Sequence, residues 1–537
     1  MQGRDDGFGR RGRSANIRGA ERLLASHYRG MDAVIECDDQ SEVIDFLSRG
    51  DTYGVSEGVE RIDTHAASVF LAEARAYKLK RAVRYPYLDF STVEKRRQVC
   101  EVELQLNRRT APDLYLEIRA VRRKPDGALS FEEGEPVDWL VVMRRFPAQD
   151  LLAAVAERGE LNAPLMRELA DRIAAFHAEA EIRQGGGAEA MRRVIDGNRT
   201  SMEQVADVLP GEQADALHRR SIALLRELTP LLDRRAREGR VRHCHGDLHL
   251  GNICLWHGKP TLFDCLEFDP RLATIDVLYD LAFLLMDLWA RGHHYEAALL
   301  FNRYLDRTDE EDGIAAVPLF LSMRAAVRAH VEASAAHSRR GADRAAKVAA
   351  ALAFLEPQEA RLVAVGGLSG TGKSTLAAAL AARTGGTPGA RWLRSDVLRK
   401  RLHGVAPETR LPAAAYAAEA SGAVYAELLA TARRMLKDGR SVVVDAVFAR
   451  ESERQALAAV AREVGVDFTG LWLAAPADLL RERLAQRQND VSDADGAVLE
   501  RQLGYDLGDL AGWHSVSAAG SVAEVLGPAL RIMETSP

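Results

Sequence analysis

The stretch His245-Gly-Asp-Leu-His-Leu-Gly-Asn252, with Leu262-Phe-Asp264 shortly after it, decides the fold of the first half of the chain. One loop holds Asp247 and, five positions later, Asn252, while Asp264 ends a short apolar run. Transfer of a phosphoryl group to a hydroxyl needs a carboxylate beside the acceptor and oxygen ligands for Mg²⁺. We therefore predict that Asp247 is the catalytic base and that Asn252 and Asp264 are metal ligands.

A lysine and a glutamate upstream complete this pattern. Lys78 lies in a strand-like segment and Glu103 in the helix-like segment that follows it. We predict that they form the ion pair that places the α- and β-phosphates of ATP. Lys80 shares a strand face with Lys78, and Glu101 is close to Glu103, so both alternatives stay open.

The surrounding residues predict a small sheet with one inserted helix. Short apolar runs divided by charged or turn-forming residues are typical of strands, and apolar residues at helical spacing are typical of a helix. The segment after about 150 is rich in Ala, Leu, Arg and Glu and is expected to be mostly helical. The predicted strands cover 69–71, 76–80, 114–121 and 139–143, and the predicted helices cover 41–47 and 91–109.

This order of residues resembles the protein-kinase-like fold, and within it the aminoglycoside phosphotransferase family, whose loop reads HGDxHxxN rather than HRDxxxxN. The resemblance spans about 60–340 and implies an α+β bilobal kinase-like domain that uses Mg-ATP. Protein kinases have an activation segment of ~20–30 residues after the metal-binding aspartate. Here Arg271 and a helix near 275–288 follow Asp264 almost at once. We therefore expect a small-molecule acceptor rather than a peptide.

The acceptor is not expected to be an aminoglycoside, despite the family name. Such polycations need a cluster of carboxylates in the acceptor pocket, often from the end of the chain. In this sequence the corresponding end continues through the basic stretch HSRRGADRAAK into a second domain. Asp276 and Asp280 could contact the acceptor, or they could cap or orient the catalytic loop.

A second phosphate-binding motif follows near Pro357, where the mostly helical pattern gives way to strand-like runs alternating with helices. Gly367-Leu-Ser-Gly-Thr-Gly-Lys-Ser374 matches GxxxxGK[ST], after a strand-like run and before an Ala- and Leu-rich helix. Backbone N–H groups of such a loop surround phosphate oxygens at the positive end of the helix. We assign the Ser374 hydroxyl to Mg²⁺. The predicted ATP-binding residues of the loop are Gly367, Gly370, Thr371, Gly372, Lys373, Ser374 and Thr375.

Three further groups are assigned to this second site. Asp396 is predicted to accept the proton of the substrate hydroxyl, although it could instead be the N-cap of the helix VLRKRL. Asp445 ends the buried strand VVVD, where an acid can act on Mg²⁺ through water. Arg483 and Arg487 lie four apart and could fold over the transferred phosphoryl group, or could belong to a solvated helix face.

Strands at 441–445 and 469–473 alternate with helices, which indicates an α/β domain with a parallel sheet. Together with the phosphate loop, this resembles the small-molecule P-loop kinases, the group of gluconate and shikimate kinases and zeta toxins, over about 360–520. The whole chain is therefore similar to tandem proteins in which a phosphotransferase precedes an ATP-binding P-loop domain. We divide it into a flexible tail (1–30), a kinase-like domain (31–356) and a P-loop domain (357–537).

Composition limits the remaining possibilities. The 537 residues include 72 Lys and Arg against 78 Asp and Glu, a net charge of -6, which disfavours nucleic acid as a partner. The sequence contains no uncharged run of ~18 residues, so no membrane span is predicted. The N-terminus lacks an apolar secretion segment, and five cysteines without a CxxC pair predict no disulfide framework. We expect a cytoplasmic protein.

The sequence thus predicts two Mg-ATP sites that phosphorylate hydroxyl groups of small, sugar- or metabolite-like molecules. One alternative is that one domain catalyses while the other binds nucleotide and regulates. Another is a non-catalytic, nucleotide-sensing partner protein. Such a protein is expected to have lost part of its catalytic set, whereas Lys78, Asp247, Asn252 and Asp264 are all present here.

Overall fold

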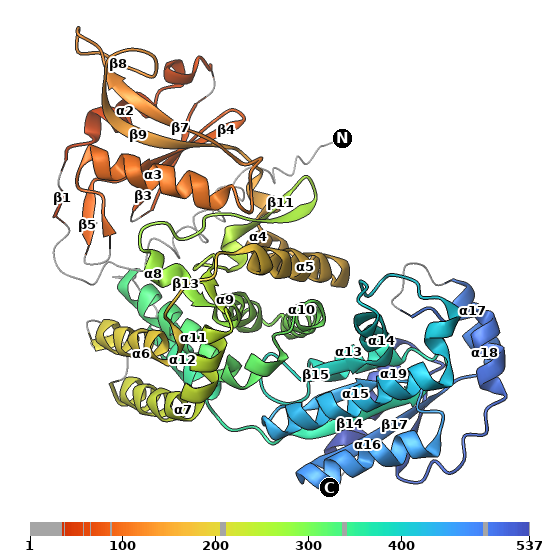
Figure 1. The fold of residues 1–537 in the computed structure, drawn as a ribbon. Helices are drawn as coiled ribbons and strands as arrows, with labels where there is room; N and C mark the ends of the chain where they lie inside the picture. Colours follow the sequence, from red (N-terminus) through yellow and green to blue (C-terminus); the bar gives the residue numbers. More distant parts are fainter. Residues whose placement is uncertain are drawn as a thin grey trace, which may run out of the picture. The chain divides into compact units, whose positions relative to one another are not determined.

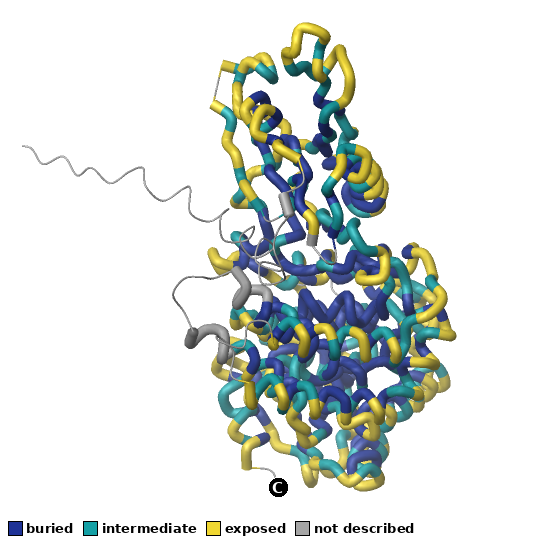
Figure 2. The backbone as a smooth tube through the Cα atoms, turned by 90° about the vertical axis from the view of Figure 1, so that its left-hand side faces the viewer, coloured by how far each residue is buried: buried dark blue, intermediate teal, exposed yellow. Residues whose placement is uncertain are grey.

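A computed structural model describes residues 35–36, 38–56, 58–64, 66–85, 88–203, 211–335, 341–486 and 492–535. The chain forms two compact units (Figure 1). Unit 1 consists of Met1–Asp287 and Leu319–Leu355, and unit 2 of Leu288–Pro318 and Glu356–Pro537. Buried residues gather in the interior and exposed residues toward the outside (Figure 2). The tail predicted for 1–30 and Arg487 lie outside the described residues.

Unit 1 begins with an antiparallel sheet of six strands in the order β2-β3-β4-β9-β7-β8. Helix α3 (Val93–Asn107) packs against β7 and β9 on one face, and α2 (Ser41–Leu47) packs on the other. The predicted strands and both predicted helices are confirmed with small shifts at their ends. The strands are β2 (Glu60–Asp63), β3 (Ala67–Ala72), β4 (Arg75–Lys80), β7 (Tyr115–Arg123), β8 (Leu129–Ser130) and β9 (Glu135–Arg144). A small antiparallel sheet beside it has β1 (Ile35–Glu36), β5 (Val83–Tyr85) and β6 (Leu88–Asp89).

The rest of unit 1 is mainly helical, as its composition predicts. Two short strand pairs, β10 with β13 and β11 with β12, interrupt the helices and carry the predicted catalytic residues on the loops that follow β10 and β12. The helices are α4 (Leu152–Glu157), α5 (Ala163–Glu179), α6 (Gly187–Glu203), α7 (Gly211–Arg237), α8 (Pro270–Ala273), α9 (Val277–Ala290), α11 (Val317–Ala335) and α12 (Gly341–Ala353). The strands are β10 (Val241–His243), β11 (Ile253–Trp256), β12 (Lys259–Leu262) and β13 (Thr274–Asp276).

Unit 2 is built on a five-stranded parallel sheet in the order β15-β16-β14-β17-β18. This confirms the predicted α/β domain. Its strands are β14 (Arg361–Gly367), β15 (Arg391–Arg394), β16 (Val442–Asp445), β17 (Asp467–Ala474) and β18 (Trp513–Ser517). Its helices are α10 (His294–Arg307), α13 (Lys373–Ala381), α14 (Ser395–Leu402), α15 (Ala418–Lys437), α16 (Glu451–Val464), α17 (Ala477–Ala485), α18 (Gly496–Leu503) and α19 (Val522–Thr535).

Helix α10 covers β15, the edge strand of this sheet. The side chain of Asn302 accepts the N–H of Trp392 at 2.7 Å and donates to the carbonyl of Ala390 at 3.1 Å. Arg391 is buried and bonds both Asp306 and Glu311 at 2.8 Å. An edge strand offers unpaired backbone groups, and here a side-chain amide pairs them. Residues 288–318 are therefore part of unit 2, whereas the division at 357 assigns them to the first domain; that division stays a prediction.

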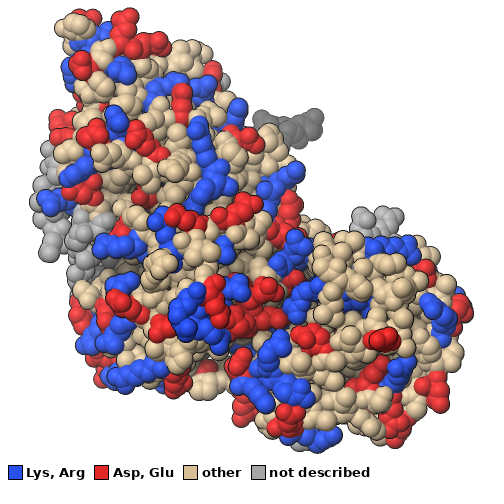
Figure 3. Space-filling model, in the orientation of Figure 1, with Lys and Arg blue, Asp and Glu red and all other residues tan. Residues whose placement is uncertain are grey.

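Acidic and basic side chains are interspersed over the face shown in Figure 3, in keeping with a net charge of only -6. Among the helices that the structure describes, none has the length and apolar character needed to cross a lipid bilayer.

Candidate active sites

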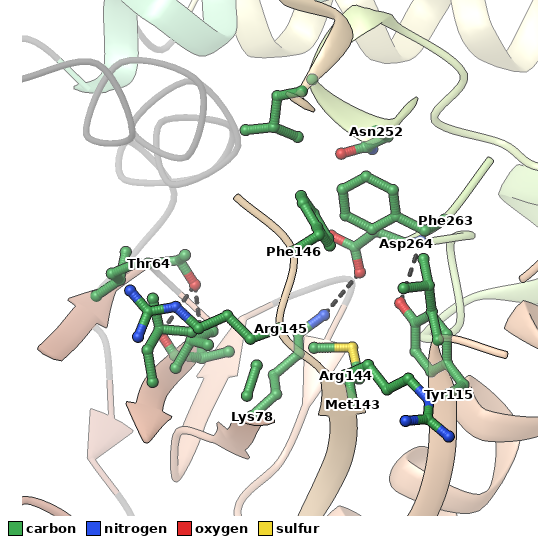
Figure 4. A pocket seen from close by; sticks show the side chains of 18 of the residues that line it. Thr64, Lys78, Tyr115, Met143, Arg144, Arg145, Phe146, Asn252, Phe263 and Asp264 are labelled. Carbon is green, nitrogen blue, oxygen red and sulfur yellow. Dashed lines mark hydrogen bonds and ion pairs between the residues drawn. The ribbon is translucent and has the colours of Figure 1, made fainter. Parts of the chain in front are cut away.

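In unit 1, one lysine bridges the helix and the loop that carry the predicted acids. The Nζ atom of Lys78 lies 2.8 Å from Oε1 of Glu103 and 2.7 Å from Oδ1 of Asp264. Figure 4 shows Lys78 and Asp264 pointing toward each other across the pocket. Burial works against the charge of Lys78, but the carboxylates of Asp264, Glu103 and Glu267 raise its pKa well above the ordinary value. Lys78 is therefore held as a cation.

The alternatives left open by the sequence are now distinguished. Lys80 lies on the same face as Lys78 but forms an ion pair with the second oxygen of Glu103, at 2.5 Å, and also contacts Glu267. Glu101 is half exposed and pairs with Arg97 on the surface of α3. Glu103 is thus the buried carboxylate of the pair, and both lysines contact it.

The predicted base and its amide neighbour are bonded to each other. The Nδ2 group of Asn252 donates to the carboxylate of Asp247 at 2.9 Å and to its backbone carbonyl at 3.0 Å. Both residues line the same pocket as Lys78 and Asp264. The four side chains therefore line one cavity.

Asp280 supports the loop that carries Asp247. Its two oxygens accept the backbone N–H groups of His245, at 3.0 Å, and Gly246, at 2.9 Å, and Nε2 of His177 lies 3.1 Å away. Gly246 has φ of +84°, and a Cβ there would lie 3.0 Å from Leu266. A buried carboxylate that accepts several N–H groups fixes the loop firmly. Asp280 thus orients the catalytic loop, which was the second of its two predicted roles.

The other acids of this region are also engaged in structural bonds. Asp276 receives two hydrogen bonds from Arg235, at 2.8 and 2.9 Å, and one from the N–H of Leu278. Asp287 accepts the N–H of Leu250 at 3.1 Å, inside the catalytic loop. The sequence offered a signal for this support, because Asp280 and Asp287 lie seven apart in the most apolar helix of the chain. Carboxylates in such a helix need buried partners.

Asp264 adopts a left-handed backbone conformation, with φ of +61°. Its N–H donates to the hydroxyl of Tyr115 at 3.2 Å, and the N–H of Cys265 donates to Oδ1 of Asn107 at 2.8 Å. A non-glycine residue with positive φ is strained unless its surroundings fix it. These two bonds, together with Lys78, hold the carboxylate of Asp264 at the pocket.

The pocket itself has a volume of about 280 Å³. Apolar side chains line it, and the Phe146 and Phe263 rings meet edge to face at 5.3 Å between centroids (Figure 4). A largely apolar cavity with a few converging polar groups at one end suits a flat base carrying phosphates. Its apolar lining includes Ile62, Val69, Leu71, Met143, Phe146 and Leu151.

In unit 2, the phosphate loop joins β14 to α13 as predicted. Gly367, Gly370 and Gly372 have φ of +138°, +84° and +84°. A Cβ on Gly367 would lie 2.6 Å from the carbonyl of Leu473, so only glycine fits this turn. Nζ of Lys373 donates to the carbonyl of Leu368 at 2.9 Å across the loop. The loop is therefore shaped to wrap an anion.

The predicted metal residues of unit 2 contact each other. Asp445 ends β16, beside β14, and its carboxylate accepts a hydrogen bond from Ser374. Burial raises the pKa of Asp445, and the charge of Lys373 opposes this shift. The structure also shows a contact that sequence reasoning missed, since Oε1 of Gln502 accepts the N–H of Ser369 at 2.7 Å. No spacing rule connects that glutamine to the loop.

Asp396 lies in the first turn of α14, which begins at Ser395 with Arg394 at the N-cap position. The helix has no side-chain cap hydrogen bond, so the alternative of Asp396 as N-cap is wrong. The Asp396 carboxylate is close enough to Asp445 for their charges to interact. Arg483 instead donates to the carbonyl of Ala518 at 2.8 Å.

Two protein families match this chain, one after the other along the sequence. Residues 127–319 match the phosphotransferase enzyme family, and residues 362–505 match the AAA domain family. An uncharacterized protein of Mycobacterium tuberculosis is 30% identical over 490 residues, which cover 88% of this chain and 95% of the relative. One of Mycobacterium bovis matches to the same extent.

The chain belongs to this tandem family of phosphotransferase and P-loop domains.

Three solved structures also show similarity to this chain. A gluconokinase from Sinorhizobium meliloti is 22% identical and covers 32% of this chain and 91% of its own, with a TM-score of 0.25. A choline/ethanolamine kinase family protein from Mesorhizobium loti is 15% identical and covers 56% and 90%, with a TM-score of 0.37. An aminoglycoside phosphotransferase from Streptomyces rimosus is 19% identical and covers 55% and 98%, with a TM-score of 0.32.

The match to the phosphotransferase enzyme family makes the protein a kinase-type phosphotransferase. Part of the stretch that matches the phosphotransferase family, 288–318, nevertheless packs in unit 2.

Proposed function

We propose that the protein transfers the γ-phosphoryl group of Mg-ATP to hydroxyl groups of small molecules, with one ATP site in each unit. The observation that carries this proposal is the convergence of Lys78, Asp247, Asn252 and Asp264 on one cavity of unit 1. Together with Glu103, they supply the phosphate contact, the base and the oxygen ligands that phosphoryl transfer requires.

In unit 1 each residue has a distinct task. Lys78, held by Glu103, binds the α- and β-phosphates, and the apolar walls of the cavity hold the base. Asp247 accepts the proton of the acceptor hydroxyl. At the same time the hydroxyl oxygen bonds to the γ-phosphorus, and the bond between that phosphorus and the β-phosphate oxygen breaks, which releases ADP. The carboxylate of Asp264 and the amide oxygen of Asn252 are suitable ligands for Mg²⁺, which neutralises charge on the phosphates.

In unit 2 the phosphate loop performs the corresponding tasks. Its backbone N–H groups and Lys373 bind the β- and γ-phosphates, and Ser374 with Asp445 holds the metal. Asp396 takes the acceptor proton. Arg483 and Arg487 are the proposed lid residues; Arg483 would have to exchange its bond to Ala518 for a phosphate oxygen.

A small acceptor is proposed for unit 1 because little chain follows the metal-binding residue. Helix α8 begins at Pro270, six positions after Asp264, and β13 follows at once, pairing with β10. We infer a sugar- or metabolite-like alcohol in the cytoplasm. The alternative is a division of labour, in which one unit catalyses and the other regulates. The experiment described next distinguishes this alternative from two catalytic units.

The test is a phosphorylation screen of a pool of cell metabolites, read by mass spectrometry. The wild-type protein is compared with Asp247→Ala, Lys373→Ala and the double variant, and Glu101→Gln is the control on an exposed carboxylate. We expect one set of products to vanish with Asp247→Ala and another with Lys373→Ala. A wild-type protein that phosphorylates no small molecule would contradict the proposal, and loss of all products in just one single variant would favour division of labour.

A further inference from the structure

Five charged side chains alternate in sign along one edge of the unit 1 pocket. Asp264 bonds Lys78 at 2.7 Å, and Lys78 bonds Oε1 of Glu103 at 2.8 Å. Lys80 then forms an ion pair with Oε2 of Glu103 at 2.5 Å and a second one with Glu267. The series therefore begins and ends in one loop, 264–267, and passes through β4 and α3. Three carboxylates face two ammonium groups, so each lysine serves two acids.

Lys80, the second lysine of this series, is deeply buried. The side chain of Lys80 is 2% exposed and that of Glu103 is 0% exposed, while Lys78 keeps 13% of its surface. Burial works against the charge of Lys80, but Glu103 and Glu267 raise its pKa. A buried ion pair is expensive to form and more expensive to break, because one charge then stays without compensation. Lys80 is therefore a fixed part of the site rather than a spare copy of Lys78.

The two lysines face different demands when phosphates bind. Lys78 has to exchange Asp264 for phosphate oxygens, and Asp264 has to turn to the metal. Glu103 would lose much of its compensation during this exchange if Lys78 were its only partner. Lys80 stays on the opposite oxygen of Glu103 and keeps Glu267 neutralised as well. The two lysines can therefore have separate tasks, because Lys78 contacts Oε1 of Glu103 and Lys80 contacts Oε2.

We propose that Lys80 is a positioning residue of the nucleotide site, which binds Glu103 to Glu267 and so leaves Lys78 for the phosphates and Asp264 for the metal. This inference rests on the proposed ATP site of unit 1. It assigns Glu267, which lines the pocket beside Asp264, to Lys80 and not to the metal. This role of Lys80 also explains why two lysines of β4, Lys78 and Lys80, both contact Glu103 of α3.

The test measures ATP and Mg²⁺ binding by calorimetry in full-length protein that carries Lys373→Ala, so that only the unit 1 site reports. Lys80→Met should weaken ATP binding at least ~10-fold, because Lys78 is then drawn to two uncompensated carboxylates. Adding Glu267→Gln should restore most of the affinity, since it removes one of those carboxylates. Lys95→Met is the control, because Lys95 is an exposed lysine of α3.

A purely structural role for Lys80 predicts the opposite for the double variant, which would bind no better than Lys80→Met. Unchanged ATP affinity in Lys80→Met would also overturn the inference. Failure of the proposed function is a different result, since Lys373→Ala protein would then bind no ATP before Lys80 is changed, and the inference would fall with it.

A second measurement keeps the inference falsifiable if Lys80→Met does not fold. Glu267→Gln alone removes a negative charge next to a retained lysine, so the protein should remain folded. The Mg²⁺ concentration that half-saturates ATP binding should then stay within about twofold of wild type. A rise of ~10-fold or more would make Glu267 a metal ligand and would overturn the assignment.

Discussion

The Nζ atom of Lys78 lies 2.7 Å from Oδ1 of Asp264, so the residue assigned to the phosphates and the residue assigned to the metal neutralise each other. The loop that carries Asp264 is fixed independently by Tyr115 and Asn107. We therefore expect phosphate and metal contacts to replace this ion pair by a change of side-chain partners, without rebuilding of the backbone.

Replacing the two aspartates of unit 1 should have different effects. In Lys373→Ala protein, Asp247→Asn keeps the shape of the side chain bonded to Asn252 but removes the base, so turnover should fall ~10²–10⁴-fold with little change in ATP affinity. Asp264→Asn should weaken binding of Mg-ATP itself. Calorimetry and initial rates measure both effects, and equal loss of ATP affinity in the two variants would contradict the assigned roles.

Asp396→Asn should abolish most turnover in unit 2 without affecting its fold. Asp396 does not cap α14, so the substitution costs no cap and only removes the proton acceptor. Rates should fall ~10²-fold or more in an Asp247→Ala background, with melting temperature and ATP binding unchanged. Asp495→Asn is the matched control, because Asp495 is the N-cap of α18 and Asn caps about as well. Wild-type turnover in Asp396→Asn would exclude it as the base.

A fragment of unit 2 should need residues 288–318 to fold. Without them Arg391 loses both of its carboxylate partners, Asp306 and Glu311, and a buried arginine left unpaired costs about 3–5 kcal/mol. We expect residues 288–318 joined by a linker to 356–537 to give a soluble protein with a cooperative thermal transition, and residues 357–537 alone to melt lower or aggregate. Equal melting temperatures for the two fragments would show that α10 is dispensable.

The stability of unit 1 should fall with acid because of His330. Burial lowers the pKa of His330 from 6.5 to about 4, and its Nε2 lies 3.1 Å from Oδ1 of Asn198. At pH values between about 4 and 6.5, the unfolded chain binds a proton at this histidine and the folded protein does not. The free energy of unfolding therefore has its full value above pH 6.5 and decreases as the pH falls toward 4. The loss is about 3 kcal/mol by pH 4. His330→Gln should show a shallower dependence of unfolding free energy on pH, and identical slopes would refute this.

The parts of both sites that the sequence predicts best are those fixed by short spacing. Asp247 and Asn252 share one loop, and the phosphate loop carries its glycines and lysine within eight residues, so local geometry alone brings these groups together. The pairing of Lys78 with Glu103 is less determined, because Lys80 has the same strand phase. Only packing of α3 decides which oxygen of Glu103 each lysine contacts.

Contacts between distant segments account for what the sequence does not predict. Gln502 reaches Ser369, and Asn302 pairs the backbone of β15, without any periodicity that connects them. The wrong N-cap alternative for Asp396 has a simple cause, since α14 starts at Ser395, two residues earlier than a helix capped by Asp396 would start. Segment 288–318 follows the phosphotransferase motifs in sequence but packs with the other unit.

The central claim is that the chain has two independent ATP sites, and the number of ATP molecules bound per chain tests it most directly. Calorimetry in the presence of Mg²⁺ should give two sites for the wild-type protein and one for Lys373→Ala. Asp264→Asn added to Lys373→Ala should remove most of the remaining binding. A single site in the wild-type protein, or complete loss of binding in Lys373→Ala, would contradict the account.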